Sequence, residues 1–289
     1  MDPFDDLLRG VCADGAVLDL TRLSPARAHR LGKGDAMTLC VPLRGAGSVA
    51  DRPLRLGDTA VVRGPEEFEA TGDMTLLVGR CRFRGETQHR LLRVLPRVAV
   101  VPEDRDFAAL RDYMADEVSR PGPGRQIVID RMLDWLLVCT LRAWFDGPDA
   151  RPPGWYRALS DDVAGPALRA LHRAPERPWT LRALAAEAGV SRTTLAKRFT
   201  ETVGEAPLAY LTGWRMTLAA DLLAERPEAT VASIARRVGY ADPFGFSAAF
   251  KRVRGLSPSE HRSAVRNGSG AAPGGDYSWN QTVLPEPGT

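Results

Sequence analysis

The sequence is poor in the residues that build metal sites, disulfide frameworks and membrane spans. Its 289 residues include four histidines and four cysteines (Cys12, Cys40, Cys81 and Cys139), all widely spaced, so we expect no metal, no cofactor and no disulfide framework. No run of 18 apolar residues occurs, which argues against a membrane-spanning helix. The acidic start, residues 1–6, lacks the pattern of a secretion signal, so a cytoplasmic protein is expected.

Lysine is rare too, and the basic residues are unevenly distributed. Only three of the 39 basic residues are lysine, so a lone arginine is weak evidence of function. Residues 179–266 hold 13 Lys+Arg against 8 Asp+Glu, a balance of +5, whereas residues 1–178 hold 26 of each. A positive excess confined to one segment is typical of a nucleic-acid-binding module.

The first hundred residues have the pattern of an antiparallel β domain. Strands are predicted at Met37–Leu43, Gly47–Ala50, Thr59–Arg63 and Met74–Phe83. In the last of these, Leu77, Gly79, Cys81 and Phe83 share one face and three arginines share the other, which predicts a half-buried strand.

Helices are predicted at residues 104–118 and 125–145, followed by a Gly/Pro-rich linker at 146–154. The apolar surface of the second helix is wide enough for a core and one partner helix. That helix either pairs with its counterpart in a homodimer or packs on the barrel of its own chain. From Ser160 to Arg266 the pattern is helical, and the polar, Gly/Pro-rich residues after Asn267 predict a disordered tail.

Two stretches of the helical region predict helix-turn-helix units. In the first, Thr180 caps a helix, Gly189 supplies the turn and Ser191 caps a second helix. About fifty residues later, Gly239 makes the equivalent turn, and Asp242 and Pro243 begin another second helix. The helix at 207–223 joins the two units, with Trp214 as the expected packing anchor.

The second helices are expected to face DNA. The expected DNA-binding residues are Arg192, Thr193, Thr194, Lys197, Arg198, Arg215, Pro243, Phe244, Gly245, Ser247, Lys251 and Arg252. The second unit has Phe244, Gly245 and Ala248 where longer polar side chains are expected. We therefore expect the first unit to carry most of the base-specific recognition.

Many spaced residues of this region match one family. They are Leu184, Ala185, Gly189, Ser191, Leu195, Phe199, Pro207, Tyr210, Leu211, Arg215, Met216, Ile234, Ala235, Gly239, Tyr240, Phe246, Phe250, Lys251, Gly255, Ser257, Pro258 and Arg262. Residues 161–262 thereby resemble the AraC/XylS family of bacterial transcription regulators. Ala248 and His261 depart from the pattern, the first at a phosphate-contacting position and the second where an aromatic residue is usual.

The resemblance extends to the N-terminal half. Residues 53–65 are similar to the Gly-Asp turn and strand of cupin barrels, which commonly precede such DNA-binding modules. Enzymatic cupins carry a His-x-His pair and a later histidine. This sequence has no such pair and has Glu66, Glu67 and Phe68 in the later region, so a metal-free barrel is expected.

Cupin heads of this family usually receive a signal. A small molecule would lie among Leu39, Val41, Leu77 and Phe83 if the barrel is hollow, and a packed barrel is equally compatible with the sequence. Because some cupin-headed relatives respond to oxidants, Cys12 and Cys81 are candidate redox residues. The alternative is that they are reduced, buried cysteines that act as small apolar groups.

These observations lead to one expected function. The fold class is α+β and multidomain, with a cupin-like antiparallel β-barrel and an all-α double helix-turn-helix domain. The expected domains are a sensor at 1–102, a helical segment at 103–146, a linker at 147–159, a DNA-binding domain at 160–266 and a tail at 267–289. The expected function is sequence-specific transcription regulation, usually activation in this family. Its partners would be promoter DNA, RNA polymerase and a small-molecule or oxidant signal.

The sequence argues against two other classes of function, an enzyme and a module that binds only proteins. The sequence lacks the metal ligands that a cupin enzyme needs. It also lacks the four-cysteine zinc cluster and the reactive Cys-Pro motif of a DNA-repair methyl acceptor. The net charge of +5 over residues 179–266 argues against a degenerate module that contacts only proteins. An enzyme is therefore not expected.

Overall fold

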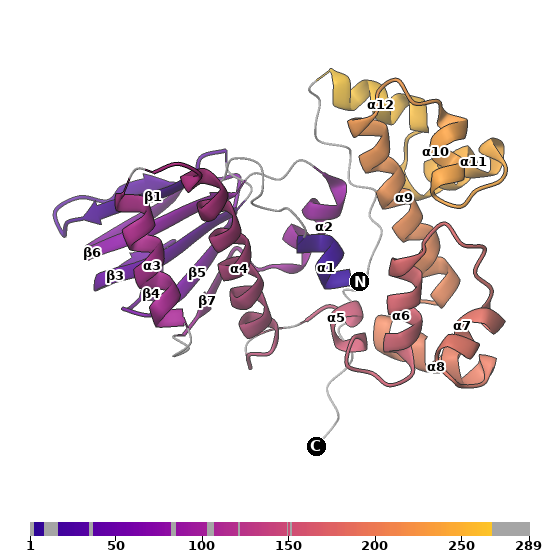
Figure 1. The fold of residues 1–289 in the computed structure, drawn as a ribbon, viewed down its shortest axis with the longest axis horizontal. Helices are drawn as coiled ribbons and strands as arrows, with labels where there is room; N and C mark the ends of the chain where they lie inside the picture. Colours follow the sequence, from indigo (N-terminus) through magenta and orange to yellow (C-terminus); the bar gives the residue numbers. More distant parts are fainter. Residues whose placement is uncertain are drawn as a thin grey trace. The chain divides into compact units, whose positions relative to one another are not determined.

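The computed structural model describes residues 3–8, 17–34, 37–81, 85–102, 107–120, 122–148, 150 and 152–267 (Figure 1). Cys12, Phe83 and the predicted tail after Asn267 lie outside the described residues. Contacts group the chain into two compact units. One, here called the helical unit, comprises Met1–Asp6, Gly85–Thr87 and Pro152–Thr289. The other, here called the sheet unit, comprises Leu7–Arg84 and Gln88–Arg151.

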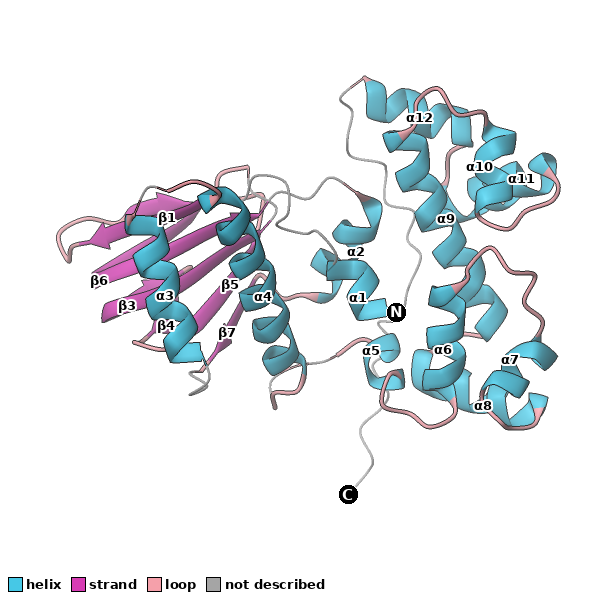
Figure 2. Ribbon diagram, viewed as in Figure 1, coloured by secondary structure: helices cyan, strands magenta, loops and turns pink. Residues whose placement is uncertain are grey.

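The sheet unit is built on one antiparallel sheet of seven described strands (Figure 2). The strands are β1 (Val17–Leu23), β2 (His29–Leu31), β3 (Met37–Val49), β4 (Arg52–Leu54), β5 (Thr59–Arg63), β6 (Phe68–Cys81) and β7 (Val98–Val101). Their order is β1-β6-β3-β5-β7, with β2 also paired to β6 and β4 to β3. The expected antiparallel architecture is confirmed. The two strands predicted between residues 37 and 50 are one strand, β3, with an irregularity between Pro42 and Arg44.

The predicted Gly-Asp turn joins β4 to β5. Gly57 has φ +95°, a conformation that glycine adopts without steric cost. The Asp58 carboxylate accepts a hydrogen bond from Arg55 N at 2.8 Å, which closes the turn.

The centre of β6 is buried on both faces, so the prediction of a half-buried strand is wrong there. Leu76 and Val78 belong to a core cluster on one face of the sheet. On the other face lie the helices α3 (Phe107–Ser119) and α4 (Arg125–Phe145) (Figure 1). A Cβ on Gly79 would lie 2.5 Å from Leu133 Cδ2 of α4, so the helix packs directly on the strand.

This covering follows from the width of the apolar surface of α4, whose bounds match the predicted 125–145. Its buried side chains pack within its own chain, as one of the two sequence interpretations required. Two short helices, α1 (Pro3–Leu8) and α2 (Glu86–Val94), were not predicted.

The helical unit consists of short helices around one long one (Figure 2). They are α5 (Gly154–Ala158), α6 (Ala164–Arg173), α7 (Leu181–Glu187), α8 (Arg192–Val203), α9 (Pro207–Glu225), α10 (Val231–Arg237), α11 (Pro243–Arg254) and α12 (Pro258–Arg266). The α+β class with a helical C-terminal part is confirmed. No described helix combines the length and the apolar character needed to cross a membrane.

The long helix α9 contributes to two separate cores. Tyr210, Leu211 and Trp214 belong to a cluster with residues of α6, α7 and α8. Further along the same helix, Met216 and Ala219 belong to a second cluster with residues of α10 and α11. Trp214 is almost fully buried, as expected of the packing anchor.

Candidate nucleic-acid interface

The first helix-turn-helix unit, α7 and α8, is held by two local caps and a glycine turn. Thr180 Oγ1 accepts a hydrogen bond from Ala183 N, and Ser191 Oγ accepts one from Thr194 N, both at 3.1 Å. Between the helices, Gly189 has φ +65°, and Val190 N donates to the carbonyl of Ala185 at 3.0 Å. These bonds satisfy backbone groups at the helix ends and fix where α8 begins.

The second unit, α10 and α11, repeats this structure. Thr230 caps α10, Gly239 has φ +84°, and Tyr240 N donates to the carbonyl of Ala235 at 2.9 Å. The equivalent positions lie 50 residues apart up to Tyr240 and 51 apart from Asp242 on, so the second turn is one residue longer. The two units are therefore structural repeats, as their spacing predicted.

The outer face of α8 is exposed and polar. Leu195 and Phe199 are buried in the unit's core, whereas the predicted DNA-binding residues lie on the exposed side. Those residues are Arg192, Thr193, Thr194, Lys197 and Arg198. Lys197 Nζ lies 3.9 Å from Glu201 Oε1, an exposed pair that stabilises the helix little.

Arg198 has a structural partner as well as an exposed position. Its guanidinium donates to Asp161 Oδ2, with both nitrogen–oxygen distances at 2.7 Å. Burial by itself raises the pKa of the Asp161 carboxyl, but hydrogen bonds from Ala164 N and Val163 N and the Arg198 pair together bring that pKa below its usual value. Arg198 thus ties α8 to the start of α6.

The outer face of α11 differs in chemistry from that of α8. Asp242 accepts hydrogen bonds from Phe244 N at 3.0 Å and Gly245 N at 2.7 Å, and thereby fixes the first turn. Phe246 and Phe250 point into the core. The predicted DNA-binding residues of α11 lie on the exposed or half-buried surface. They are Pro243, Phe244, Gly245, Ser247, Lys251 and Arg252.

Arg215 belongs to α9 and not to a second helix, and its guanidinium contacts the loop before α7. Nε donates to the carbonyl of Pro175 at 2.7 Å, and Nη2 donates to the carbonyl of Arg177 at 2.8 Å. Burial lowers the pKa of Arg215, and the electrostatic interactions with Tyr240 and Glu176 partly raise it again. Its guanidinium carbon also lies 5.6 Å from the centre of the Tyr240 ring. Arg215 therefore joins the loop of the first unit to the turn of the second.

The departures from the family pattern do not disturb the fold. His261 is buried and lies edge-on to Phe250, with 5.6 Å between ring centres, so it packs as an aromatic residue would. It belongs to α12, which Ser257 and Glu260 begin with a reciprocal capping box. Ala248 is exposed on α11 and has no group that can bind a phosphate.

An N-terminal segment completes the core of the helical unit, which sequence reasoning missed. His172 of α6 is buried, and its Nε2 lies 2.7 Å from Tyr210 Oη. On the other side, His172 Nδ1 lies 2.6 Å from Asp6 Oδ2. Phe4 is also buried, with its ring centre 5.5 Å from that of Tyr156. Phe4 and Asp6 thus supply contacts to residues more than 150 positions away.

The cysteines and the predicted cavity-lining residues of the sheet unit are all buried where the structure describes them, except Cys139, which is half-buried. Cys81 is fully buried and disulfide-bonded, so the interpretation of Cys81 as a reduced cysteine is wrong. Cys40 is a free, fully buried thiol whose pKa is raised by burial to about 12. Val41 and Leu77, expected to line a ligand cavity, instead contact the α3 and α4 side of the sheet, where the space is about 10 Å³. Leu39 is buried as well.

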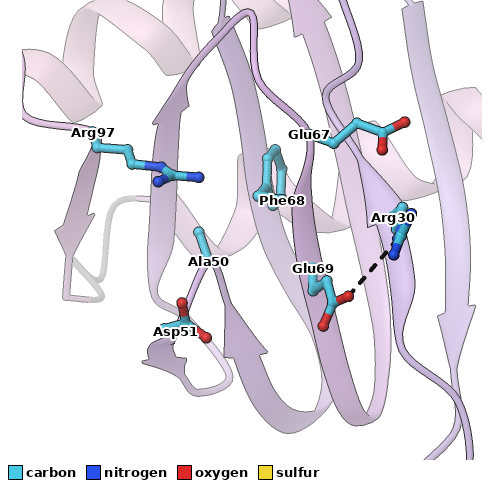
Figure 3. A pocket seen from close by; sticks show the side chains of 7 residues that line it. All are labelled: Arg30, Ala50, Asp51, Glu67, Phe68, Glu69 and Arg97. Atoms are coloured by element: carbon cyan, nitrogen blue, oxygen red, sulfur yellow. Dashed lines mark ion pairs between the residues drawn. The ribbon is translucent and has the colours of Figure 1, made fainter.

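A larger cavity, of about 450 Å³, opens elsewhere in the sheet unit (Figure 3). It is lined by Arg30, Ala50, Asp51, Glu67, Phe68, Glu69 and Arg97. Arg30 Nε lies 3.8 Å from Glu69 Oε1, and in Figure 3 the Arg97 guanidinium points toward the Phe68 ring. Its volume falls in the range of small-molecule sites, and its lining is mostly polar, unlike the apolar lining that was expected.

Comparisons with known proteins agree with this architecture. A cupin family model matches residues 67–146, and a helix-turn-helix domain model matches residues 184–264. A putative AraC-like transcription regulator of Streptomyces antibioticus is 34% identical over 90% of this chain and 86% of its own length. Another, from Streptomyces lividans, is 39% identical over 66% of this chain and 64% of its own length.

Among solved structures, the DNA-binding domain of the global transcriptional factor AdpA in complex with a target DNA is 35% identical. The match covers 37% of this chain and 96% of that domain, with a TM-score of 0.34. Both Streptomyces relatives are named as putative transcription regulators.

Proposed function

Because the chain belongs to the AraC family of DNA-binding transcription regulators and carries an N-terminal cupin domain, we propose that it reads promoter DNA with both helix-turn-helix units. In this proposal α8 and α11 enter successive major grooves of one site. One observation carries it: two structurally repeated units each leave the outer face of a capped second helix exposed. As the family resemblance implies, the regulation would be activation, with RNA polymerase as a partner.

The connection between the units supports a fixed spacing. The 19 residues of α9 extend roughly 28 Å at 1.5 Å per residue, and successive major grooves are roughly 34 Å apart. α9 contributes to both cores, and Arg215 adds a link between the loop before α7 and the turn at Gly239. The two second helices are therefore held at one separation, which a composite site requires.

We propose that α8 carries most of the polar base readout. Arg192 and Lys197 offer donors suited to guanine edges and phosphates. Replacing either residue with alanine should weaken binding to a duplex selected from a random library, by on the order of tenfold. The measurement is the dissociation constant at several salt concentrations. A lost phosphate contact should reduce the slope of log K against log salt by about one.

An alanine variant of Arg266, an exposed arginine of α12, serves as the matched control and should bind normally. If both the Arg192 and the Lys197 variants keep the affinity of the wild type, α8 is not the reading helix. If the wild type binds selected and random duplexes equally well at every salt concentration, the proposed function itself is wrong.

We propose that the signal is an oxidant acting at Cys81. Cys81 is disulfide-bonded, and Cys12, the other redox candidate from the sequence, lies outside the described residues. We propose these two cysteines as the redox-active pair. In this reaction, two thiols give two electrons and two protons to a two-electron oxidant such as hydrogen peroxide, and the products are a disulfide and two waters.

Replacing Cys81 with serine should abolish any peroxide-dependent change in DNA affinity. In the wild type, a coupling of typical size would make that change on the order of tenfold. The dissociation constant for the selected duplex is measured with and without peroxide, alongside migration on a non-reducing gel. A Cys139→Ser variant is the control and should respond like the wild type. An unchanged response of the Cys81→Ser variant would remove the redox proposal.

We also propose a homodimer through α4. Although its buried side packs on the sheet, Ile127 and Trp135 are exposed on the helix, and Tyr113 is exposed on α3. These side chains provide apolar area for a second chain. The dependence of the mass in solution on protein concentration tests this part of the proposal.

A further inference from the structure

The first turn of α11 presents a phenyl ring to solvent. Phe244 is 86% exposed, the largest exposed fraction among the large apolar side chains of the described residues. Its position is fixed because Asp242 accepts a hydrogen bond from its backbone N–H and Pro243 precedes it. A phenyl ring exposed to water on a rigid turn is unfavourable, so burying it against a partner would favour binding of that partner.

The surroundings of Phe244 on the helix follow a gradient from apolar to basic. Ala248 lies one turn further along the same side, and Lys251 and Arg252 lie one turn beyond that, all of them exposed. The basic end is suited to phosphates, and the end with Phe244 and Ala248 offers only apolar surface.

The described side chains of the first turn of α11 also offer no unused hydrogen-bond donor for reading base edges. Pro243 and Gly245 have no side-chain donor or acceptor. Ser247, the nearest hydroxyl, donates its hydrogen to the carbonyl of Pro243 at 2.9 Å. In helix-turn-helix proteins the N-terminal residues of the second helix reach the base edges. A base contact made by this turn would therefore have to use apolar surface.

We propose that Phe244 recognises the C5-methyl group of a thymine in the major groove, and that the second unit is specific through this methyl contact and not through hydrogen bonds. The thymine methyl is the apolar feature that distinguishes this base edge, and phenylalanine is among the side chains that contact it. The inference rests on the proposed function, since it requires α11 to lie in a major groove. It assigns the second unit a definite base preference.

Uracil tests the proposal because it differs from thymine in DNA only by this methyl group. A duplex is first selected from a random library with the full-length protein, and each thymine is then replaced in turn by deoxyuridine. We expect at least one replacement to weaken binding about fourfold, the factor for burying one methyl group. The Phe244→Ala variant should bind the thymine duplex about as weakly as the wild type binds the uracil duplex. Replacing thymine by uracil should then weaken binding by the variant no further, which a double-mutant cycle of protein and DNA measures.

Two controls separate this effect from general ones. Val265, on α12, is 40% exposed, and its alanine variant should keep the full thymine preference. The Arg192→Ala variant should lose affinity but keep the same ratio between the thymine and uracil duplexes. Because Phe244 is exposed, the Phe244→Ala variant should unfold at the wild-type temperature.

Three results would overturn the inference while leaving the proposed function standing. In the first, the wild type binds its selected duplex specifically but no uracil replacement weakens binding. In the second, Phe244→Ala shows the same uracil penalty as the wild type. In the third, Phe244→Ala keeps full DNA affinity and loses only activation of transcription in vitro, which would assign the ring to a protein partner. Failure of the wild type to prefer any duplex would instead overturn the proposed function.

Discussion

Replacing Gly239 with alanine is expected to destabilise the helical unit by about 3 kcal/mol, the sum of a strained backbone and a steric clash. At φ +84° an L-residue is strained, and a Cβ there would lie 2.4 Å from the carbonyl oxygen of Glu176 and 2.7 Å from Arg215 Nη2. The Arg215 side chain can move, but then it loses its bonds to the Pro175 and Arg177 carbonyls. The affinity for a duplex with both half-sites should fall with the stability.

Gly189 provides the matched control for this prediction. It occupies the same position of the first unit with φ +65°, but nothing lies within 4 Å of where its Cβ would be. Gly189→Ala should therefore cost only the backbone term, about 1 kcal/mol. Urea unfolding of both variants gives the comparison. Equal losses would show that the contact of Gly239 with the loop before α7 does not matter.

Replacing Asp6 with alanine is expected to cost about 2 kcal/mol, although Asp6 lies far from the helix-turn-helix units in sequence. The change removes the carboxylate oxygen 2.6 Å from His172 Nδ1, so a buried polar atom loses this hydrogen bond. Asp6→Asn keeps an acceptor oxygen and should cost less than half as much. The free energy of unfolding of the full-length protein, followed by an intrinsic tryptophan signal, is the measurement.

Shortening the chain provides an independent check. A variant that lacks residues 1–6 also loses the buried Phe4 and should be less stable than Asp6→Ala by about 2 kcal/mol, the usual gain from burying such a ring. If Asp6→Ala and the truncated protein both unfold like the wild type, the N-terminal segment is not part of the core.

The capped helices and glycine turns could be predicted from sequence because their hydrogen bonds are local. Thr180, Ser191 and Thr230 each bond a backbone N–H three residues ahead, so a cap and the apolar spacing after it identify the helix start. The same holds for the buried residues of α8, which recur at intervals of four. Repetition of this pattern about fifty residues later made the double unit the firmest inference from the sequence.

The side of β6 that meets the helices could not be predicted in the same way. Alternation correctly separated Leu77 and Gly79 from Leu76 and Val78, but it could not show that α4 covers one of these faces. The strand is consequently buried on both sides, and the space near Leu77 is filled by Met114 and Leu136. Which face holds a cavity depends on packing between elements distant in sequence.

The two helix-turn-helix units were thus determined by the sequence alone, because each is specified within about 25 residues by caps, turns and periodicity. Only the tertiary structure decided that Arg215 bonds carbonyls 38 and 40 residues away, that Arg198 pairs with Asp161, and that Asp6 reaches His172 across 166 residues. No spacing rule relates such residues, since the folding of the whole unit brings them together. The same packing buries Phe246 and Phe250 and leaves Phe244 exposed.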